Sequence, residues 1–362
     1  MHRTTMRHVL VSVLALAVVC VSSASAGSAG EAATAQKKPT KKQLKAVGAK
    51  LVADARRAGD IHFYTSTDPV TAQKLADAFE KNYKIHATFT RAVSGPLAAR
   101  YNAEAQAGNF VADAVIISNP PFFADAFQRG WTVRMRTWQD APSLYTLAKK
   151  FKFYGSVGVG ISRVNGVVIN TNRLTGSSVP NTWQALTNSR FEGRMIIGDP
   201  RTVPVNMGIW QLLRKTYGDN FLRSIAAQRP RVVASMVGGV QSVAAGEADV
   251  AVGANILHMT PLLSSAPNAP VRLITPQGPD FGFTWNVGVS ARSPNPAGGK
   301  LFVNWLLTPQ GQRIFNEQGG VSVLPNVTIA GSEPIGDRYN TVSSNVSPAN
   351  QAQILSLLGL SR

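Results

Sequence analysis

The sequence predicts an α/β protein whose sheets are built from strand–helix–strand units. Three short apolar runs, at 61–64, 85–89 and 112–117, alternate with two segments of helical period, at 70–83 and 96–107. Strands and helices of these lengths in alternation are typical of a parallel sheet. A chain of 362 residues is too long for one small core, and 44% hydrophobic with 15% charged residues is a globular composition. We therefore expect two domains or lobes.

The N-terminus has the pattern of an export signal. Arg3 and Arg7 precede an apolar run at 9–21, and small residues at 24–26 fit a cleavage site. The run is too short to favour a membrane-spanning helix. We predict that residues 1–26 are a signal peptide and that the protein is secreted across the inner membrane.

The only cysteine, Cys20, lies inside this signal. Cleavage after Ala26 leaves a chain without cysteine, which excludes disulfides, thiolate metal sites and cysteine nucleophiles. Lipidation at Cys20 is the alternative, although Val18 and Val19 are larger than the residues expected before a lipidation site.

The formal net charge of +18 favours an anionic partner: a small acidic ligand, anionic lipid or nucleic acid. Nucleic-acid binding requires basic residues interleaved with aromatic ones in one patch. The dense basic runs here, 37–38 and 41–42, lie instead in an N-terminal tail. We therefore expect no nucleic-acid partner and interpret the tail as a solvated basic stalk.

The remaining elements are expected in the following order. Residues 27–58 form a basic linker and an amphipathic helix at 41–58 that ends at Gly59, and Pro120-Pro121 begin a helix that closes at Gly130. Asn165-Gly166 is a hairpin-type dipeptide between strands at 157–161 and 167–169. Further strands are predicted at 195–197, 231–235, 248–253, 271–275 and 284–290, and helices at 207–217, 240–246, 296–316 and 350–360.

Four pieces of sequence resemble the extracellular solute-binding proteins of bacterial ABC importers, in the branch that contains ferric-iron, thiamine and phosphonate binders. They are 63–66 followed by 76–80, then 112–115, then 240–248, and finally 286–289 followed by 304–312. The resemblance is carried by their order across roughly 59–325.

This resemblance implies a two-lobed periplasmic-binding-protein fold (type II), with mixed sheets flanked by helices and a crossing-strand hinge. Lobe one would comprise 59–165 and 282–362, and lobe two 166–281. It implies a monomer in the periplasm or at the cell surface that binds a small polar or anionic ligand between its lobes and delivers it to a membrane permease, with no cofactor and no catalysis.

Candidate ligand-binding residues in lobe one follow the predicted strands. In parallel sheets the ligand crevice lies outside the carboxyl ends of the strands. The residues there are Thr65, Ser66, Ser94, Gly95, Ser118 and Asn119. Ser94-Gly95 also open a helix, whose free N–H groups and dipole favour an anion. The alternative for each is an ordinary helix N-cap.

Candidates in lobe two lie in two loops. Arg201, Thr202 and Asn206 separate a strand from a helix, and Arg201 could offer a planar fork to an oxyanion or simply form a surface ion pair. Asn255 and His258 follow the predicted strand at 248–253. The aromatic residues Tyr64 and Trp285 are candidates for the wall, with a core position as the alternative.

Three other functions are alternatives to this one. Ferric-binding members of the family resemble one another in adjacent iron-ligating tyrosines, whereas this chain has Asn255 and His258 there and no tyrosine nearby, which argues against iron. The sequence contains no P-loop, Gly-x-Ser-x-Gly or His-Glu-x-x-His motif that would indicate an enzyme. A secreted basic module that binds polyanionic surfaces stays an alternative on charge alone.

Overall fold

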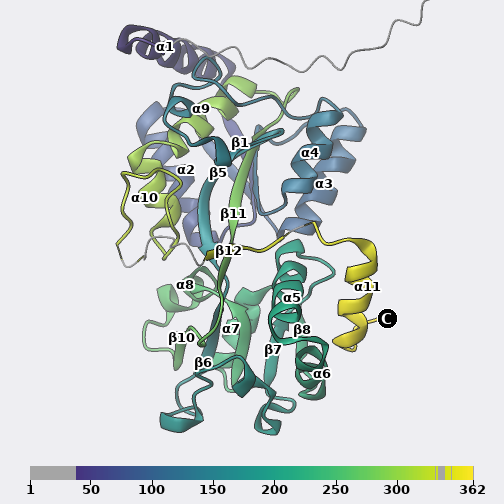
Figure 1. The fold of residues 1–362 in the computed structure, drawn as a ribbon. Helices are drawn as coiled ribbons and strands as arrows, with labels where there is room; N and C mark the ends of the chain where they lie inside the picture. The colour runs from purple at the N-terminus through teal and green to yellow at the C-terminus, as the bar shows by residue number, and fades with distance from the viewer. Residues whose placement is uncertain (1–37, 331, 333–338, 344, 362) are drawn as a thin grey trace, which may run out of the picture. The chain divides into compact units, whose positions relative to one another are not determined.

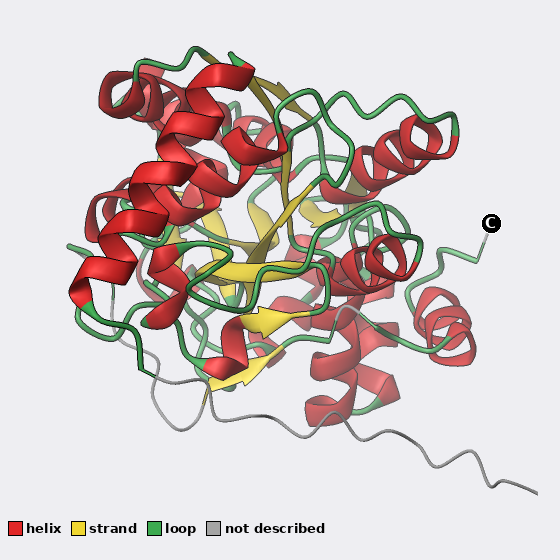
Figure 2. Cartoon of the chain, turned by 90° about the horizontal axis from the view of Figure 1, so that it is seen from above, coloured by secondary structure: helices red, strands yellow, loops and turns green. Residues whose placement is uncertain are grey.

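The computed structural model of the protein describes residues 38–330, 332, 339–343 and 345–361. The predicted export signal, Cys20 and most of the basic linker lie outside the described residues. Within the described ranges, no helix is both long and apolar enough to cross a membrane. From Pro39 onward the chain forms one unit that contains two β-sheets with helices on their faces (Figures 1 and 2).

The predicted N-terminal helix is confirmed as α1 (Lys41–Ala58). A capping box begins it, because the side chains of Thr40 and Gln43 each accept the other residue's backbone N–H. Gly59 ends it with φ +95°, a conformation that favours glycine. Leu51 and Ala55 are buried, and α1 packs against α9 (Pro296–Leu306).

The first sheet carries the stretch in which the sequence predicted strand–helix–strand units. Its strand order is β2 (Ala87–Arg91), β1 (Ile61–Thr65), β3 (Ala114–Ile117), β11 (Asp280–Val289), β5 (Ser156–Arg163) and β4 (Lys152–Phe153), and β12 (Tyr339–Thr341) pairs with β11. β1 is parallel to β2 and β3, whereas β11 is antiparallel to β3 and β5. The sheet is therefore mixed.

Helices cover both faces of this sheet because successive strand residues point to opposite sides. Phe63 stacks on Phe302 of α9 at 4.7 Å between ring centroids, in a core shared with α2 (Pro69–Tyr83). Tyr64 belongs to the core of the other face, with α3 (Ser94–Gln106) and α4 (Pro120–Gln128).

The second sheet has the strand order β10 (Val271–Ile274), β6 (Gly166–Asn170), β9 (Val250–Ala254), β7 (Met195–Gly198) and β8 (Arg231–Val233). β7 is parallel to β8 and β9, and β6 is antiparallel to β9 and β10. Ile197 packs in the core with α5 (Pro204–Tyr217) and α6 (Asp219–Ala227), and Ile196 with α7 (Met236–Ala244) and α8 (Ile256–Ser265).

The hairpin predicted at Asn165-Gly166 is wrong. β5 belongs to the first sheet and β6 to the second, so the chain crosses between the sheets at this point. The return strand β11 holds the crossing: Val164 N–H donates to the Phe281 carbonyl at 3.0 Å, and Asn165 Nδ2 donates to Asp280 Oδ1 at 3.2 Å. These long-range contacts replace the strand pairing that the dipeptide suggested.

Some element boundaries differ from the prediction. The helix expected at 296–316 is divided into α9 and α10 (Pro309–Asn316), because Pro309 ends the first and Thr308 caps the second. β11 begins at Asp280, earlier than expected, and α6, α8, β4 and β12 were not predicted. Short 3-10 helices fill several connections: η1 (Pro142–Tyr145), η2 (Lys149–Phe151), η3 (Gly176–Ser178), η4 (Gln184–Thr187) and η5 (Ser189–Phe191).

The C-terminal segment connects the two halves of the structure. β12 pairs with β11 of the first sheet, and α11 (Pro348–Leu357) then packs against α5 and α6 of the second (Figure 1). Ile354 is fully buried in this contact. The sequence assigned residues 282–362 to the first lobe, whereas α11 lies against helices of the second.

Candidate functional site

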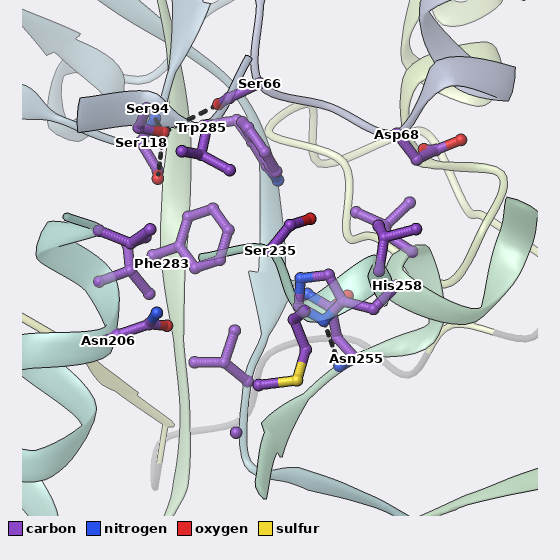
Figure 3. A pocket seen from close by; sticks show the side chains of 18 of the residues that line it. Ser66, Asp68, Ser94, Ser118, Asn206, Ser235, Asn255, His258, Phe283 and Trp285 are labelled. Carbon is purple, nitrogen blue, oxygen red and sulfur yellow. Dashed lines mark hydrogen bonds between the residues drawn. The ribbon is translucent and has the colours of Figure 1, made fainter. Parts of the chain in front are cut away.

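A cavity of about 80 Å³ lies between the two sheets, with residues from both around it (Figure 3). Its volume is several times what one water molecule requires. The residues that line it come from strand ends, helix starts and the crossing strands: Ser66, Asp68, Arg91, Val93, Ser94, Ser118, Val164, Val203, Val205, Asn206, Ala234, Ser235, Met236, Val237, Gly253, Asn255, Leu257, His258, Phe283 and Trp285.

Three predicted hydroxyls meet on the first-sheet side of the cavity. Ser66 Oγ lies 2.9 Å from Ser94 Oγ, which lies 3.2 Å from Ser118 Oγ (Figure 3). They come together because β1 runs parallel to β2 and β3, so the residues after these strands gather at one edge. We call them the serine chain.

The serine chain lies at the N-terminus of α3. Ser94 begins this helix, and the N-cap residue Val93 provides no side-chain hydrogen bond. The first N–H groups of a helix have no partner within the helix, and its dipole makes that end positive. Hydroxyl donors and a helix N-terminus together favour an oxyanion.

Arg91, which the sequence analysis did not select, adds a positive charge to the cavity. It is the last residue of β2, and its Nε donates to the Thr67 carbonyl at 3.1 Å. Among the residues that the structure describes, no carboxylate forms a salt bridge with it. Burial lowers the pKa of Arg91, and the charge of Asp68 opposes that effect.

Two acceptor atoms around the cavity have no partner. Asp68 caps α2, with Oδ1 accepting the Thr71 N–H at 2.9 Å, but its Oδ2 is buried and makes no hydrogen bond. Asn255 Oδ1 is buried without a partner as well. A buried polar atom left unpaired costs about 1–3 kcal/mol, which makes both atoms notable.

His258 is held in one tautomer. Its Nδ1 accepts the Asn255 backbone N–H at 3.1 Å, so the proton of the neutral ring is on Nε2. Burial, with a smaller contribution from the charge of Arg91, lowers the pKa of His258 to about 4. At neutral pH the ring is therefore an uncharged hydrogen-bond donor.

The rest of the wall is largely apolar. Trp285 Nε1 donates to Ser162 Oγ at 2.8 Å, which fixes the indole ring, and Phe283 packs edge-on against it at 5.0 Å between centroids. Aliphatic side chains of both halves complete the wall. Such a surface with a few converging polar groups is typical of a small-molecule site.

Three of the predicted first-lobe residues have other partners. Tyr64 lies on the far face of the sheet, where its hydroxyl donates to Glu104 at 2.7 Å, and burial raises its pKa. Thr65 is buried and bonds to Thr67. Asn119 Oδ1 accepts the Phe122 N–H and caps α4, so this residue is an ordinary helix N-cap.

The predicted residues at 201–202 lie against other groups. Arg201 pairs with Asp199 at 2.9 Å; burial alone would raise the pKa of Asp199, but hydrogen bonds from Arg201 lower it overall. Thr202 faces Gly95, where an added Cβ would overlap the Thr202 carbonyl oxygen. Asn206 does line the cavity, and its Nδ2 donates to the Asp199 carbonyl at 3.3 Å.

The fold and this cavity can be compared with known proteins. The family model described as bacterial extracellular solute-binding protein matches residues 61–320 of the chain. The chain belongs to this family. A relative in Haemophilus influenzae, an uncharacterized protein, is 26% identical over 300 residues, which cover 79% of this solute-binding protein and 84% of the relative.

Solved structures show the same type II periplasmic-binding-protein fold. The periplasmic binding protein AfuA from Actinobacillus pleuropneumoniae, with fructose-6-phosphate bound, has a TM-score of 0.64 and 19% identity, over 83% of this chain and 97% of that one. Iron-bound HitA from Pseudomonas aeruginosa has a TM-score of 0.64 and 16% identity, over 84% and 98%. The solute-binding protein therefore has two lobes, each built on one of the sheets.

Sequence reasoning missed Asp68 and Arg91 in this solute-binding protein, although both lie at the carboxyl ends of parallel strands. Asp68 follows β1 by three residues, and Arg91 ends β2. The signal for each was a charged residue at the carboxyl end of a parallel strand, the same position that identified the serines. Among the described residues, no group of three or more His, Cys, Asp or Glu side chains could hold a metal ion.

Proposed function

We propose that this solute-binding protein captures a small polar or anionic molecule in the cavity between its lobes and presents it to the permease of an ABC importer. The observation that supports this most is the half-buried side chain of Arg91, which forms no salt bridge with a carboxylate of the described residues and lines the same cavity as the serine chain and the α3 N-terminus. An oxyanion would satisfy all three.

Each lobe provides different contacts to the ligand. Arg91 and the serine chain hold the oxyanion, while Asn206 and the Nε2–H of His258 reach the ligand from the second lobe. Trp285 and Phe283 enclose its apolar part. Tyr64, Thr65, Asn119 and Arg201 have no direct role, because each has a partner elsewhere.

The ligand binds by hinge closure. Lobe one comprises 59–165 and residues from 282 onward, and lobe two comprises 166–281. α11 follows lobe one in the sequence but packs against α5 and α6 of lobe two. The crossing at Val164 and Asn165, held by β11, is the hinge. The close approach of Gly95 to Thr202 supports this closure, because it brings residues of the two proposed lobes into contact.

The function is binding without chemistry. A serine nucleophile needs a neighbouring base, but His258 Nδ1 already accepts a backbone N–H and its Nε2 carries a proton. The serine hydroxyls hydrogen-bond to one another instead. The protein is a monomer that is exported by residues 1–26, works in the periplasm or at the cell surface, and has no nucleic-acid partner.

An organic oxyanion suits the cavity better than ferric ion. HitA carries iron and AfuA carries a sugar phosphate, in the same fold. Here the cavity lining contains no tyrosine, and Asp68 is its only carboxylate. Hard cations such as ferric ion require several oxygen anions, which this lining does not provide.

A thermal-shift panel at fixed salt tests the proposal. It contains organic phosphates, phosphonates, thiamine, small carboxylates, and ferric ion with and without citrate. A ligand present at about 100 times its dissociation constant adds about 2.7 kcal/mol of stability. We expect a selective shift with an organic oxyanion. A shift with ferric ion alone would contradict the assignment, and salt-dependent binding to any polyanion would favour the surface-binding alternative.

A further inference from the structure

Three titratable residues line the cavity: the basic Arg91, the acidic Asp68 and His258. The His258 ring is neutral at pH 7 because burial lowers its pKa to about 4. The charge of Asp68 acts on Arg91, yet the two side chains form no salt bridge. The cavity is therefore close to neutral as a whole, with separated charges of opposite sign.

The unpartnered acceptors add an independent observation. Asp68 is 4% exposed and Asn255 is 7% exposed, and each has one oxygen without a hydrogen-bond donor. Asp68 Oδ1 caps α2, so helix capping accounts for one oxygen of the carboxylate and not for the buried Oδ2. Buried carboxylates without a partner are rare because the unmet charge is costly. A donor from the ligand would remove that cost.

The two kinds of group occupy different sides of the cavity. Figure 3 shows the serine chain on one side and Asp68, His258 and Asn255 on the other, with Trp285 between them. A ligand that carries only an oxyanion would satisfy the donors and leave Asp68 buried and unpaired. A ligand with a donor group as well would satisfy both sides.

We infer that the ligand is a compact zwitterion, whose oxyanion meets Arg91 and the serine chain and whose ammonium group meets Asp68 and Asn255. This inference rests on the proposed function, because it describes the ligand of the same cavity. It differs from the expectation that the net charge of +18 gives, which is an anion of any kind.

Matched pairs of small molecules test this inference by isothermal titration calorimetry on the mature protein. Each pair differs only in its amino group: 2-aminoethylphosphonate and ethylphosphonate, taurine and ethanesulfonate, β-alanine and propionate. Hydrogen bonds to charged groups are strong enough to make the zwitterion of a pair bind roughly tenfold to a hundredfold more tightly.

The variant Asp68→Asn keeps an oxygen that can cap α2 and removes the charge. We expect the zwitterion to lose its advantage, and the partner without the amino group to bind at least as tightly as before, because Arg91 is no longer opposed. Asp68→Ser, another good N-cap, provides a second folded variant. Asp77→Asn, an exposed position on the same helix, is the matched control and should leave both affinities unchanged.

The outcomes separate the two claims. Equal affinity within every pair would overturn the zwitterion inference and leave the proposed function intact, with water satisfying the two acceptors. An unchanged preference in Asp68→Asn would also overturn it. If no member of any pair binds and the wider oxyanion panel is flat, the proposed function fails, and this inference fails with it.

Discussion

His258 gives the solute-binding protein a loss of stability in acid that one substitution should remove. The ring is neutral at pH 7, with Nδ1 accepting the Asn255 N–H. Protonation of His258 would put a proton on Nδ1, which then could no longer accept the Asn255 N–H, and would place a positive charge on a buried ring. His258→Gln keeps the acceptor, because Gln is the usual third residue of a capping box, and it does not titrate.

The magnitude follows from the two pKa values. An ordinary histidine has a pKa of 6.5, and folding lowers that of His258 to about 4. Between these values the unfolded chain binds the proton and the folded chain does not, so stability falls as the pH falls through this window and is constant above it. The full difference corresponds to about 3 kcal/mol.

The assay is urea denaturation at a series of pH values from neutral down to about 4, followed by tryptophan fluorescence, for the wild-type protein and His258→Gln. We expect the wild type to lose about 3 kcal/mol more than the variant over this range, at similar m-values. His86→Gln is the control of opposite sign. A neighbouring Glu80 raises the pKa of exposed His86, so its contribution is present in acid and is lost as pH rises. Parallel curves for wild type and His258→Gln would refute the reasoning.

Three further outcomes are expected. Arg91→Gln should weaken oxyanion binding roughly tenfold to a hundredfold by calorimetry, because it removes a charge-assisted contact, whereas Arg129→Gln at an exposed ion pair should not; equal effects would contradict the assignment. Gly95→Ala should lower ligand affinity with little change in unfolding free energy, since the added Cβ would overlap the Thr202 carbonyl across the contact between the lobes, and opening of the hinge would relieve that overlap; unchanged affinity would show that this contact does not form in the bound state. Asn295→Ala should cost about 2–4 kcal/mol in urea denaturation, because its side chain caps α9 and its amide donates to two carbonyls at the end of α1; a smaller loss would mean that water replaces these bonds.

The sequence predicted the serine chain because the rule behind it is topological. Parallel strands end at the same edge, so hydroxyls that follow three such strands must come close together whatever the detailed packing. Ser66, Ser94 and Ser118 do so. The division at Pro309 was also visible, since proline cannot continue a helix, and the long helix at 296–316 was predicted against that signal.

Other features depended on which of several competing contacts forms, and the local sequence pattern does not decide that. Asn165-Gly166 has hairpin chemistry, but the competing contacts with β11 come from residues more than a hundred positions later. Tyr64 lies on a strand whose alternate residues face opposite cores, and the sequence does not show which face meets the cavity. Arg201 had a partner two residues away in Asp199, and this local ion pair took precedence over the ligand role.

The overall charge of the chain and the charge of its cavity describe different things. A net charge of +18 is a property of the surface, where it governs solubility and long-range attraction. Inside the cavity, Arg91 is opposed by Asp68, and a third titratable group, His258, is neutral. Selectivity follows from groups that are desolvated when the lobes close, because only there does an unpaired donor or acceptor carry its full cost. The unpaired oxygen of Asp68, rather than the surplus of lysine and arginine, therefore defines the kind of solute that this protein should select.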